Sequence, residues 1–223
     1  MTVLALAGGE WGLHRLVEDH LAEGAACRLT DPTAELDLSI VTPHLVSGHL
    51  GDVRIGGSLG SDAPVGATLE ARLDDVHVGL FGSGPRTASD GSARVTVGWA
   101  NLPLDSFGGP LGGALRPGEQ DGYLALEGPG LTLLAAVDVA DGELRVTPDV
   151  LLTQGQEIQV SRFLPLIEQR SPEAATQLQP RSVPLPDLPD GVTLTGAEVS
   201  GTGLVLNADL DPTALLADSE ACS

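Results

Sequence analysis

The sequence predicts an α+β protein in which a strongly curved, bulged antiparallel β-sheet wraps around or packs on an N-terminal helix and a second helix. Three observations favour this class. Between residues 35 and 210, extended segments repeatedly carry an apolar residue at every second position, which is typical of strands buried on one face. Two other segments carry apolar residues at helical spacing. Glycine (29 of 223 residues) and proline (16) are frequent, which indicates many turns between short elements.

The first helix is expected over residues 10–27, "EWGLHRLVEDHLAEGAAC". Its apolar face is formed by positions three or four residues apart: Leu13, Leu16, Val17, His20, Leu21 and Gly24. A second helix is expected over 161–178, where Pro172 should break or restart it. Residues 1–9 form an apolar stub shorter than the ~20 residues that a membrane span needs. This stub is either the remnant of a membrane anchor or a frayed start.

Two strands are expected to contain β-bulges. In "VGATLEARLDDVHVGLFG", apolar residues hold odd positions up to Leu73 and even positions from Val76 onward. One extra residue at Asp74–Asp75 returns both halves to the same face, as a β-bulge does. The segment 192–199 shows the same shift around Thr195–Gly196. Because bulges bend and twist a strand, we expect a strongly curved sheet.

The remaining strands are expected at 35–40, 50–59, 92–100, 123–128, 131–140, 143–148 and 203–210. The Asp-Gly pair in "VADGEL" predicts a tight hairpin turn. Residues 104–122 are rich in glycine and proline and are expected to form a mobile loop. Prolines 184, 186 and 189 predict a stiff extended strap before the last hairpin. No internal repeat divides the chain, so we expect one domain over 10–223.

The formal net charge of −20, from 31 acidic and 11 basic residues, argues against nucleic acid as a partner, because phosphate backbones repel an acidic surface. It also disfavours a purely electrostatic attraction to anionic membranes. The two cysteines, Cys27 and Cys222, match no zinc or redox spacing. They form either a disulfide, which would place the protein in an oxidising compartment, or two free thiols.

Catalytic motifs are not found in the sequence: it contains no nucleophile elbow, phosphate-binding loop or zinc-protease motif. His14 and Glu18 have metal-binding spacing on a helix, but no third ligand accompanies them, so we interpret them as solvated polar groups. His44 and His49 are interpreted as surface histidines. Ser47, His44 and Asp52 are triad-type residues whose spacing alone indicates no triad. We therefore expect no enzyme activity, no cofactor and no metal site.

Several segments, in their order along the chain, resemble one known family. "HLVSGHLGDVRI" follows the first helix, and "ARVTVGWANLPLDSFGG" and "GELRVTPDVLLTQGQEIQV" follow in turn. The proline-rich strap "VPLPDLPDG" then precedes the hairpin "VTLTGAEVSGTGLVLNA". Over roughly residues 10–210 the chain resembles the LmeA-like phospholipid-binding proteins of the actinobacterial cell envelope. The strap and the final hairpin are the most specific part of this resemblance.

The resemblance implies a fold related to the tubular lipid-binding (TULIP) class. It implies noncatalytic binding of phospholipid or another acyl-chain lipid, contact with a membrane surface and support of envelope glycolipid or lipoglycan maintenance. It also implies a cell-envelope, periplasmic or secreted protein, while the sequence itself leaves the cytoplasm open. The alternative is a structural or protein-interaction module of the envelope with a fully packed core.

The residues that would line a lipid groove are aliphatic side chains of the strands and of the turn before residue 49. A packed core would use the same side chains, so both interpretations stay open. The turn at Leu45–Val46 and the loop 104–122 are expected to admit the lipid. The full set is Leu45, Val46, Val53, Ile55, Leu69, Leu73, Val76, Val78, Leu133, Val137, Leu194 and Val199.

Overall fold

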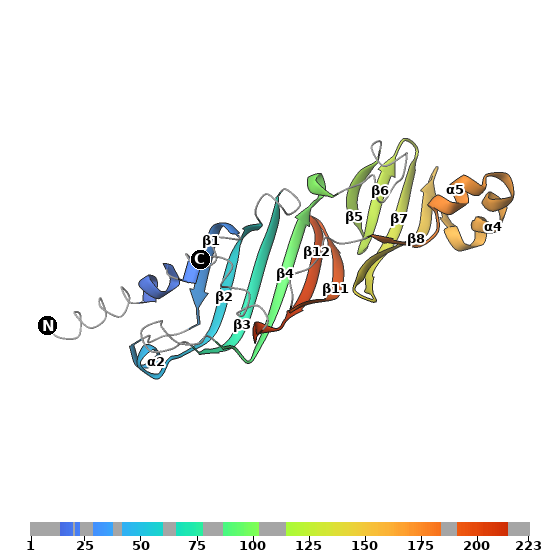
Figure 1. Ribbon diagram of the computed structural model, residues 1–223. Coiled ribbons are helices and arrows are strands. Elements are labelled where there is room, and N and C mark those ends of the chain that lie inside the picture. Colours follow the sequence, from blue (N-terminus) through green and yellow to red (C-terminus); the bar gives the residue numbers. More distant parts are fainter. Residues whose placement is uncertain are drawn as a thin grey trace. The chain divides into compact units, whose positions relative to one another are not determined.

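The structure is a computed structural model that describes residues 14–19, 21–22, 29–37, 42–59, 66–77, 87–102, 115–183 and 191–213. These residues form two open antiparallel β-sheets with short helices, which confirms the α+β class (Figure 1). They group into two compact units: residues up to 95 with 191–193 and 207–213, and residues 96–183 with 194–206. The single domain over 10–223 stays a prediction. No helix in the described part of the chain is long and apolar enough to cross a membrane.

The first sheet has the strand order β1-β2-β3-β4-β12-β11 (Figure 1). Its strands are β1 (Leu29–Leu36), β2 (His49–Leu59), β3 (Ala67–His77), β4 (Asp90–Gly98), β11 (Val192–Ser200) and β12 (Gly203–Leu210). Helix α2 (Thr42–Ser47) lies between β1 and β2, and the 3-10 turn η2 (Trp99–Asn101) follows β4. The strand expected at 35–40 is β1, which begins earlier than predicted, at Leu29, and ends at Leu36, while residues 38–40 lie outside the described part of the chain. The register of β1 with β2 shifts between Thr30 and Thr33, where Asp31 has φ 51°.

The strands β1 to β3 give the first sheet one apolar and one charged face. On one face, Leu36 pairs with Val53, and Val53 in turn pairs with Leu73. On the other face, Glu35 pairs with Arg54, and Arg54 pairs with Arg72. Since side chains alternate along a strand, this register separates the aliphatic residues from the charged ones. We call these the apolar face and the charged face.

The β-bulge predicted at Asp74–Asp75 is confirmed. Val76 pairs with Gly51 and Leu73 with Val53, so that two residues of β3 stand opposite the single residue Asp52 of β2. Asp75 has φ 54°, the left-handed conformation that a bulge can require. The apolar face is therefore preserved from Leu73 to Val76, as the parity shift indicated. The bulge predicted around Thr195–Gly196 stays a prediction, as does the strong curvature of the sheet.

A second shift lies next to the first and cancels it. His49 pairs with His77 and Gly51 with Val76, so Leu50 of β2 has no opposite residue on β3. Gly51 has φ 66°, which glycine adopts at little cost. Beyond both bulges, β2 and β3 are back in the register that they have at Val53 and Leu73.

The second sheet has the order β10-β8-β7-β6-β5, with β9 also paired to β8. Its strands are β5 (Arg116–Gln120), β6 (Tyr123–Gly128), β7 (Leu131–Ala140), β8 (Glu143–Thr153), β9 (Gln156–Gln159) and β10 (Arg181–Val183). Asp141 and Gly142 both have positive φ between paired Ala140 and Glu143, which confirms the predicted tight turn. Leu134 and Ala135 are both buried, so β7 is covered on both faces.

The prediction of a mobile loop over 104–122 is wrong for its last residues, because 116–120 form β5. Pro117 and Gly118 suggested a loop, but β5 is an edge strand with a partner on one side only, where proline is tolerated. Asp121 and Gly122, with φ 54° and 80°, then turn the chain into β6. Residues 103–114 lie outside the described part of the chain.

Two helices follow β9, as predicted. Helix α4 (Val160–Arg170) contains Pro165, and α5 (Pro172–Gln177) starts with Pro172 at its first turn. Proline is favourable there because the first helical N–H has no intrahelical acceptor. Pro172 therefore separates the two helices, which lie together in Figure 1.

The N-terminal helical segment, residues 14–19 and 21–22, packs on the apolar face. Val17 and Leu21 contact the cluster of buried residues Leu36, Leu50, Val53 and Val76. Leu16, expected on the buried side, is 66% exposed. Val17 and Leu21 lie four residues apart and therefore on the same side of the helix. The buried side of this helical segment is narrower than the apolar side predicted from the sequence. The Glu18 carboxylate, expected to face solvent, accepts a 3.4 Å hydrogen bond from the backbone N–H of Leu36.

Candidate functional site

The structure brings four of the proposed lipid-lining residues together on the apolar face. Val53 (1% exposed) and Val76 (7%) belong to its buried cluster, and Ile55 and Leu73 pack against them while remaining partly exposed. These residues come from adjacent strands, and the bulge in β3 keeps Leu73 and Val76 on the same side. These four predicted residues therefore lie on one surface.

Leu69 extends this surface along β3. Leu69 pairs with Gly57 of β2, and this pair follows two positions after the pair of Ala71 with Ile55. Leu69 and Ala71 are each only partly buried, in contrast to Val53, which lies nearer the bulges. The apolar face is thus buried beside the N-terminal helical segment, at Val53 and Val76, and again at Ala67. Its half-open part consists of the partly buried residues between them, Ile55, Leu69, Ala71 and Leu73.

Among the described residues, the other proposed lining residues are neither in this buried cluster nor packed against it. Leu133 and Val137 lie on β7 of the second sheet, both partly buried, and Leu194 (8% exposed) and Val199 lie on β11. Val46 is 71% exposed on α2. Val78 and the side chain of Leu45 lie outside the described residues.

Helix α4 exposes two large apolar side chains one turn apart. Phe163 is 44% exposed and Leu166 is 56% exposed. Arg162 and Arg170 are also exposed on this helix, which carries two of the eleven arginines of the chain. Glu168 is exposed on the same helix, so its charge is mixed. Exposed apolar side chains beside cations are one feature of helices that lie at a membrane surface.

A hollow of about 430 Å³ opens at one end of the second sheet. It lies between the β6–β7 turn at Gly130 and the β8–β9 turn at Gly155. Its lining is mostly polar and it opens widely to solvent. An acyl chain needs an apolar enclosure, so we do not assign a lipid to this hollow.

An arginine holds two carboxylates together on the charged face. The Arg72 guanidinium donates to Asp74 at 2.9 Å and to Asp52 at 2.6 Å. These hydrogen bonds, first that to Asp74 and then that to Asp52, raise the pKa of Arg72 above its usual value. Asp52 and Asp74 are consequently engaged by Arg72.

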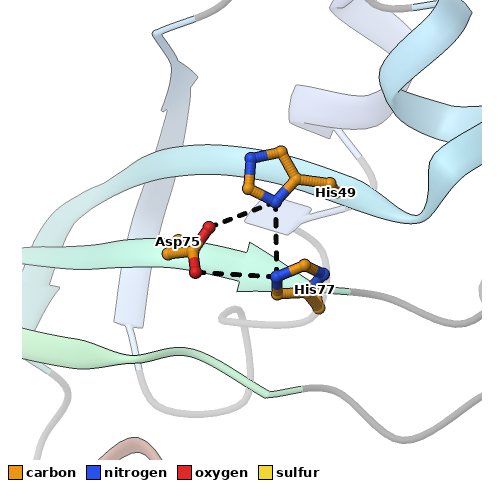
Figure 2. Close-up of side chains that lie close together, drawn as sticks. All are labelled: His49, Asp75 and His77. Carbon is orange, nitrogen blue, oxygen red and sulfur yellow. Dashed lines mark hydrogen bonds and ion pairs between the residues drawn. The ribbon is translucent and has the colours of Figure 1, made fainter.

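Beside this arginine, His49, Asp75 and His77 converge on one point (Figure 2). His49 Nδ1 lies 3.1 Å from Asp75 Oδ1, and His77 Nε2 lies 3.6 Å from Asp75 Oδ2. The two ring nitrogens, His49 Nδ1 and His77 Nε2, are 3.3 Å apart. Their rings are tilted by 57°, with centroids 4.7 Å apart. We call these three residues the His–Asp–His cluster.

The backbone explains this convergence. His49 and His77 are cross-strand partners, and Asp75 lies two residues before His77, on the bulge. The neighbours Leu50 and Val76 are buried in the apolar face, which places the imidazoles on the opposite face. His77 also exchanges backbone hydrogen bonds with Thr87, at 2.7 and 3.0 Å. The backbone of His77 is therefore paired with β2 on one side and with Thr87 on the other.

Comparison with known proteins gives one match. The sequence model of the LmeA-like phospholipid-binding family matches residues 8–209. The chain belongs to this family. No curated protein and no solved structure matches the chain. The LmeA-like family match spans both β-sheets and the N-terminal helical segment, and it confirms the resemblance seen in the strap and the final hairpin.

The polar candidates of the sequence have different surroundings in this LmeA-like chain. His14 Nδ1 lies 3.3 Å from Glu18 Oε1, as the helical spacing predicts. Asp52, proposed near Ser47, is bound by Arg72. The side chain of His44 lies outside the described residues, as do Cys27 and Cys222, so the disulfide stays a prediction.

The His–Asp–His cluster was not predicted from the sequence, in which His44 is the histidine nearest to His49 and His77 lies 28 residues away. The signal that could have found it was present: the Asp75-x-His77 pair directly follows the predicted bulge. Placing His49 opposite His77 needs the β2–β3 register, which the composition of the connection 60–66 does not determine.

Proposed function

We propose that this protein binds phospholipid without chemical conversion and that the acyl chains lie on the half-open part of the apolar face. Membership of the LmeA-like phospholipid-binding family is the observation that carries the proposal. The apolar face supports the location, because Ile55, Leu69 and Leu73 are aliphatic and only partly buried. A lipid tail there would remove from water a surface that the described chain leaves exposed.

The driving force for such binding is the hydrophobic effect. Each methylene group that leaves water contributes about 0.8 kcal/mol. Aliphatic strand residues offer no hydrogen bonds, so they would select an acyl chain by its apolar surface and its fit. The lipid would thus be held through its tails. The chain's fold would be a variant of the tubular lipid-binding (TULIP) class, with the sheet curved around those tails.

We further propose that α4 contacts the membrane from which the lipid is taken. Phe163 and Leu166 supply the exposed apolar pair, and Arg162 and Arg170 supply the flanking positive charge. The strongly acidic remainder of the chain would be repelled by anionic lipids, so contact through this helix would also orient the protein. The cell envelope, on the periplasmic side, is the proposed location, and upkeep of envelope glycolipids or lipoglycans is the proposed role.

Lipid binding is tested with two variants of adjacent residues. Leu69→Gln places a polar group on the half-open apolar face, whereas Thr68→Gln places the same group on the opposite, solvent-exposed side of β3. Protein extracted gently from cells is analysed by native mass spectrometry. We expect phospholipid bound to the parent protein and to Thr68→Gln, and much less of it on Leu69→Gln.

A lipid-free mass for the parent protein would instead favour the structural or protein-interaction module. Equal lipid content in the two variants would contradict the proposed position. Recovery of released fatty acid, in place of intact phospholipid, after incubation would contradict the noncatalytic role.

A further inference from the structure

We propose that the His–Asp–His cluster is a binding site for a zinc-class divalent transition-metal ion. The cluster lies on the charged face, on the opposite side of the sheet from the proposed lipid surface. The proposal therefore does not rest on lipid binding. It rests on the distances among the three side chains, on their chemistry and on the backbone that holds them.

The distances match those in a tetrahedral metal site. Ligand atoms that lie about 2.0–2.1 Å from a zinc ion are about 3.3–3.4 Å from one another in a regular tetrahedron. In the cluster, His49 Nδ1 lies 3.1 Å from Asp75 Oδ1 and 3.3 Å from His77 Nε2, and His77 Nε2 lies 3.6 Å from the second carboxylate oxygen, Asp75 Oδ2. An ion would therefore need only small side-chain rotations to bind both ring nitrogens and a carboxylate oxygen.

The ligand types indicate the class of metal. Two imidazole nitrogens and one carboxylate oxygen suit zinc and neighbouring transition metals, and they leave at least one position for water or another ligand. Calcium and magnesium prefer sites made of oxygen atoms only. The net charge of −20 adds a general attraction for cations. Zinc is accordingly the metal to test first.

The hydrogen-bonding pattern is compatible with an ion. His49 Nδ1 faces both His77 Nε2 and a carboxylate oxygen of Asp75. A neutral imidazole carries one N–H, and a proton on each of the two facing nitrogens would bring the donors into repulsion. A metal ion at the meeting point would accept a lone pair from all three groups at once.

The backbone around the cluster is preorganised for this arrangement. Asp75 occupies a left-handed conformation at the bulge, and His77 is fixed by β2 and by the bridge to Thr87. Arg72 engages the neighbouring carboxylates Asp52 and Asp74, whereas Asp75 contacts the two histidines.

Metal binding is tested by isothermal titration of tag-free, chelator-treated protein with zinc chloride. Three variants each remove one ligand: His49→Gln, His77→Gln and Asp75→Asn. Asparagine tolerates a left-handed conformation, so Asp75→Asn preserves the bulge. The control is His14→Gln, which removes a histidine that also has a carboxylate partner at 3.3 Å but lies outside the cluster.

We expect one zinc ion per chain in the parent protein and in His14→Gln. Loss of an outer partner of a metal ligand already lowers affinity by about 10–100-fold, so loss of a direct ligand should cost at least about tenfold. Cobalt added in place of zinc should give the intense visible absorption of a tetrahedral site, and magnesium should give no binding. Circular dichroism without metal shows whether each variant is folded.

The proposal is overturned if the parent protein takes up no zinc, or if folded cluster variants bind zinc as tightly as the parent does. If one of the three variants does not fold, the matching alanine variant takes its place. The cobalt absorption of the other two variants is then compared with that of the parent protein. Equal losses in His14→Gln and in the cluster variants would also reject the site, because they would indicate nonspecific binding to surface histidines.

Discussion

His49 and His77 are direct cross-strand partners although the register between their strands shifts twice between this pair and the pair Val53–Leu73. The extra residue of β3 at Asp74–Asp75 is compensated by the extra residue of β2 at Leu50. Without the compensation, the two histidines would lie on opposite faces, since a slip of one residue reverses every side chain. The pair of bulges therefore keeps the apolar face continuous and brings the two imidazoles together.

The conformation of Asp75 leads to a prediction on stability. Asp75→Ala and Asp75→Gly both remove the carboxylate, but only alanine retains a Cβ at φ 54°. Because a Cβ disfavours this region by roughly 1–2 kcal/mol, the alanine variant should be less stable than the glycine variant by about 1 kcal/mol. Urea unfolding measures the difference.

A control at Glu70 should give the opposite order. Glu70 is an exposed residue of the same strand and has no positive φ among the residues that the structure describes. Glycine inside a regular strand costs entropy, so Glu70→Gly should be less stable than Glu70→Ala by about 0.5–1 kcal/mol. The same order at both positions would contradict the conformation assigned to Asp75.

Gly203, the first residue of β12, should not tolerate a side chain. A Cβ there would overlap the carbonyl oxygen of Val97 and would come within 2.9 Å of the Cα of Gly98. These are backbone atoms, which cannot rotate away, so Gly203→Ala should cost about 3 kcal/mol or more, at the upper end of overpacking effects. Thermal unfolding measures the loss. Gly201→Ala, in the same hairpin, meets nothing within 4 Å and should change stability little.

Some of this structure could be predicted from the sequence because the signals are local. The bulge at Asp74–Asp75 follows from the side-chain parity of one strand, and the end of α4 follows from Pro172. The aspartate–glycine turn after β7 is equally local, since the two residues themselves favour positive φ. Leu73 and Val76 could be placed on one face because they share a parity once the bulge is included.

The other features of the fold and of the site depend on the order of the strands in the two sheets. Pro117 and Gly118 suggested a loop, and only the position of β5 at a sheet edge makes a strand there acceptable. Leu133 and Leu69 have similar sequence surroundings but lie in different sheets. His49 and His77 meet through a register that no local pattern encodes. Strand order and register were therefore missing from the prediction, and with them the cluster.

The N-terminal helical segment allows a comparison between two leucines. Leu21 packs against the buried cluster of the apolar face, whereas Leu16 is 66% exposed. Leu21→Ala should lower the free energy of unfolding by about 1–2 kcal/mol, less than for a fully buried leucine. Leu16→Ala should change it by no more than about 0.5 kcal/mol. Equal effects in urea unfolding would show that the helical segment packs through a different stripe.

The exposed pair on α4 allows membrane contact to be separated from folding. Phe163→Ser combined with Leu166→Ser removes two side chains that are 44% and 56% exposed, so stability should change little. Their partial insertion into lipid would contribute more than 1.4 kcal/mol, so sedimentation with phosphatidylcholine–phosphatidylglycerol vesicles should weaken by about tenfold or more. The control, Ser161→Ala with Gln169→Ala, changes exposed polar positions of the same helix and should bind as the parent does. Unchanged sedimentation of the serine variant would place the membrane contact elsewhere, because a hydrophobic contact through α4 requires these two side chains.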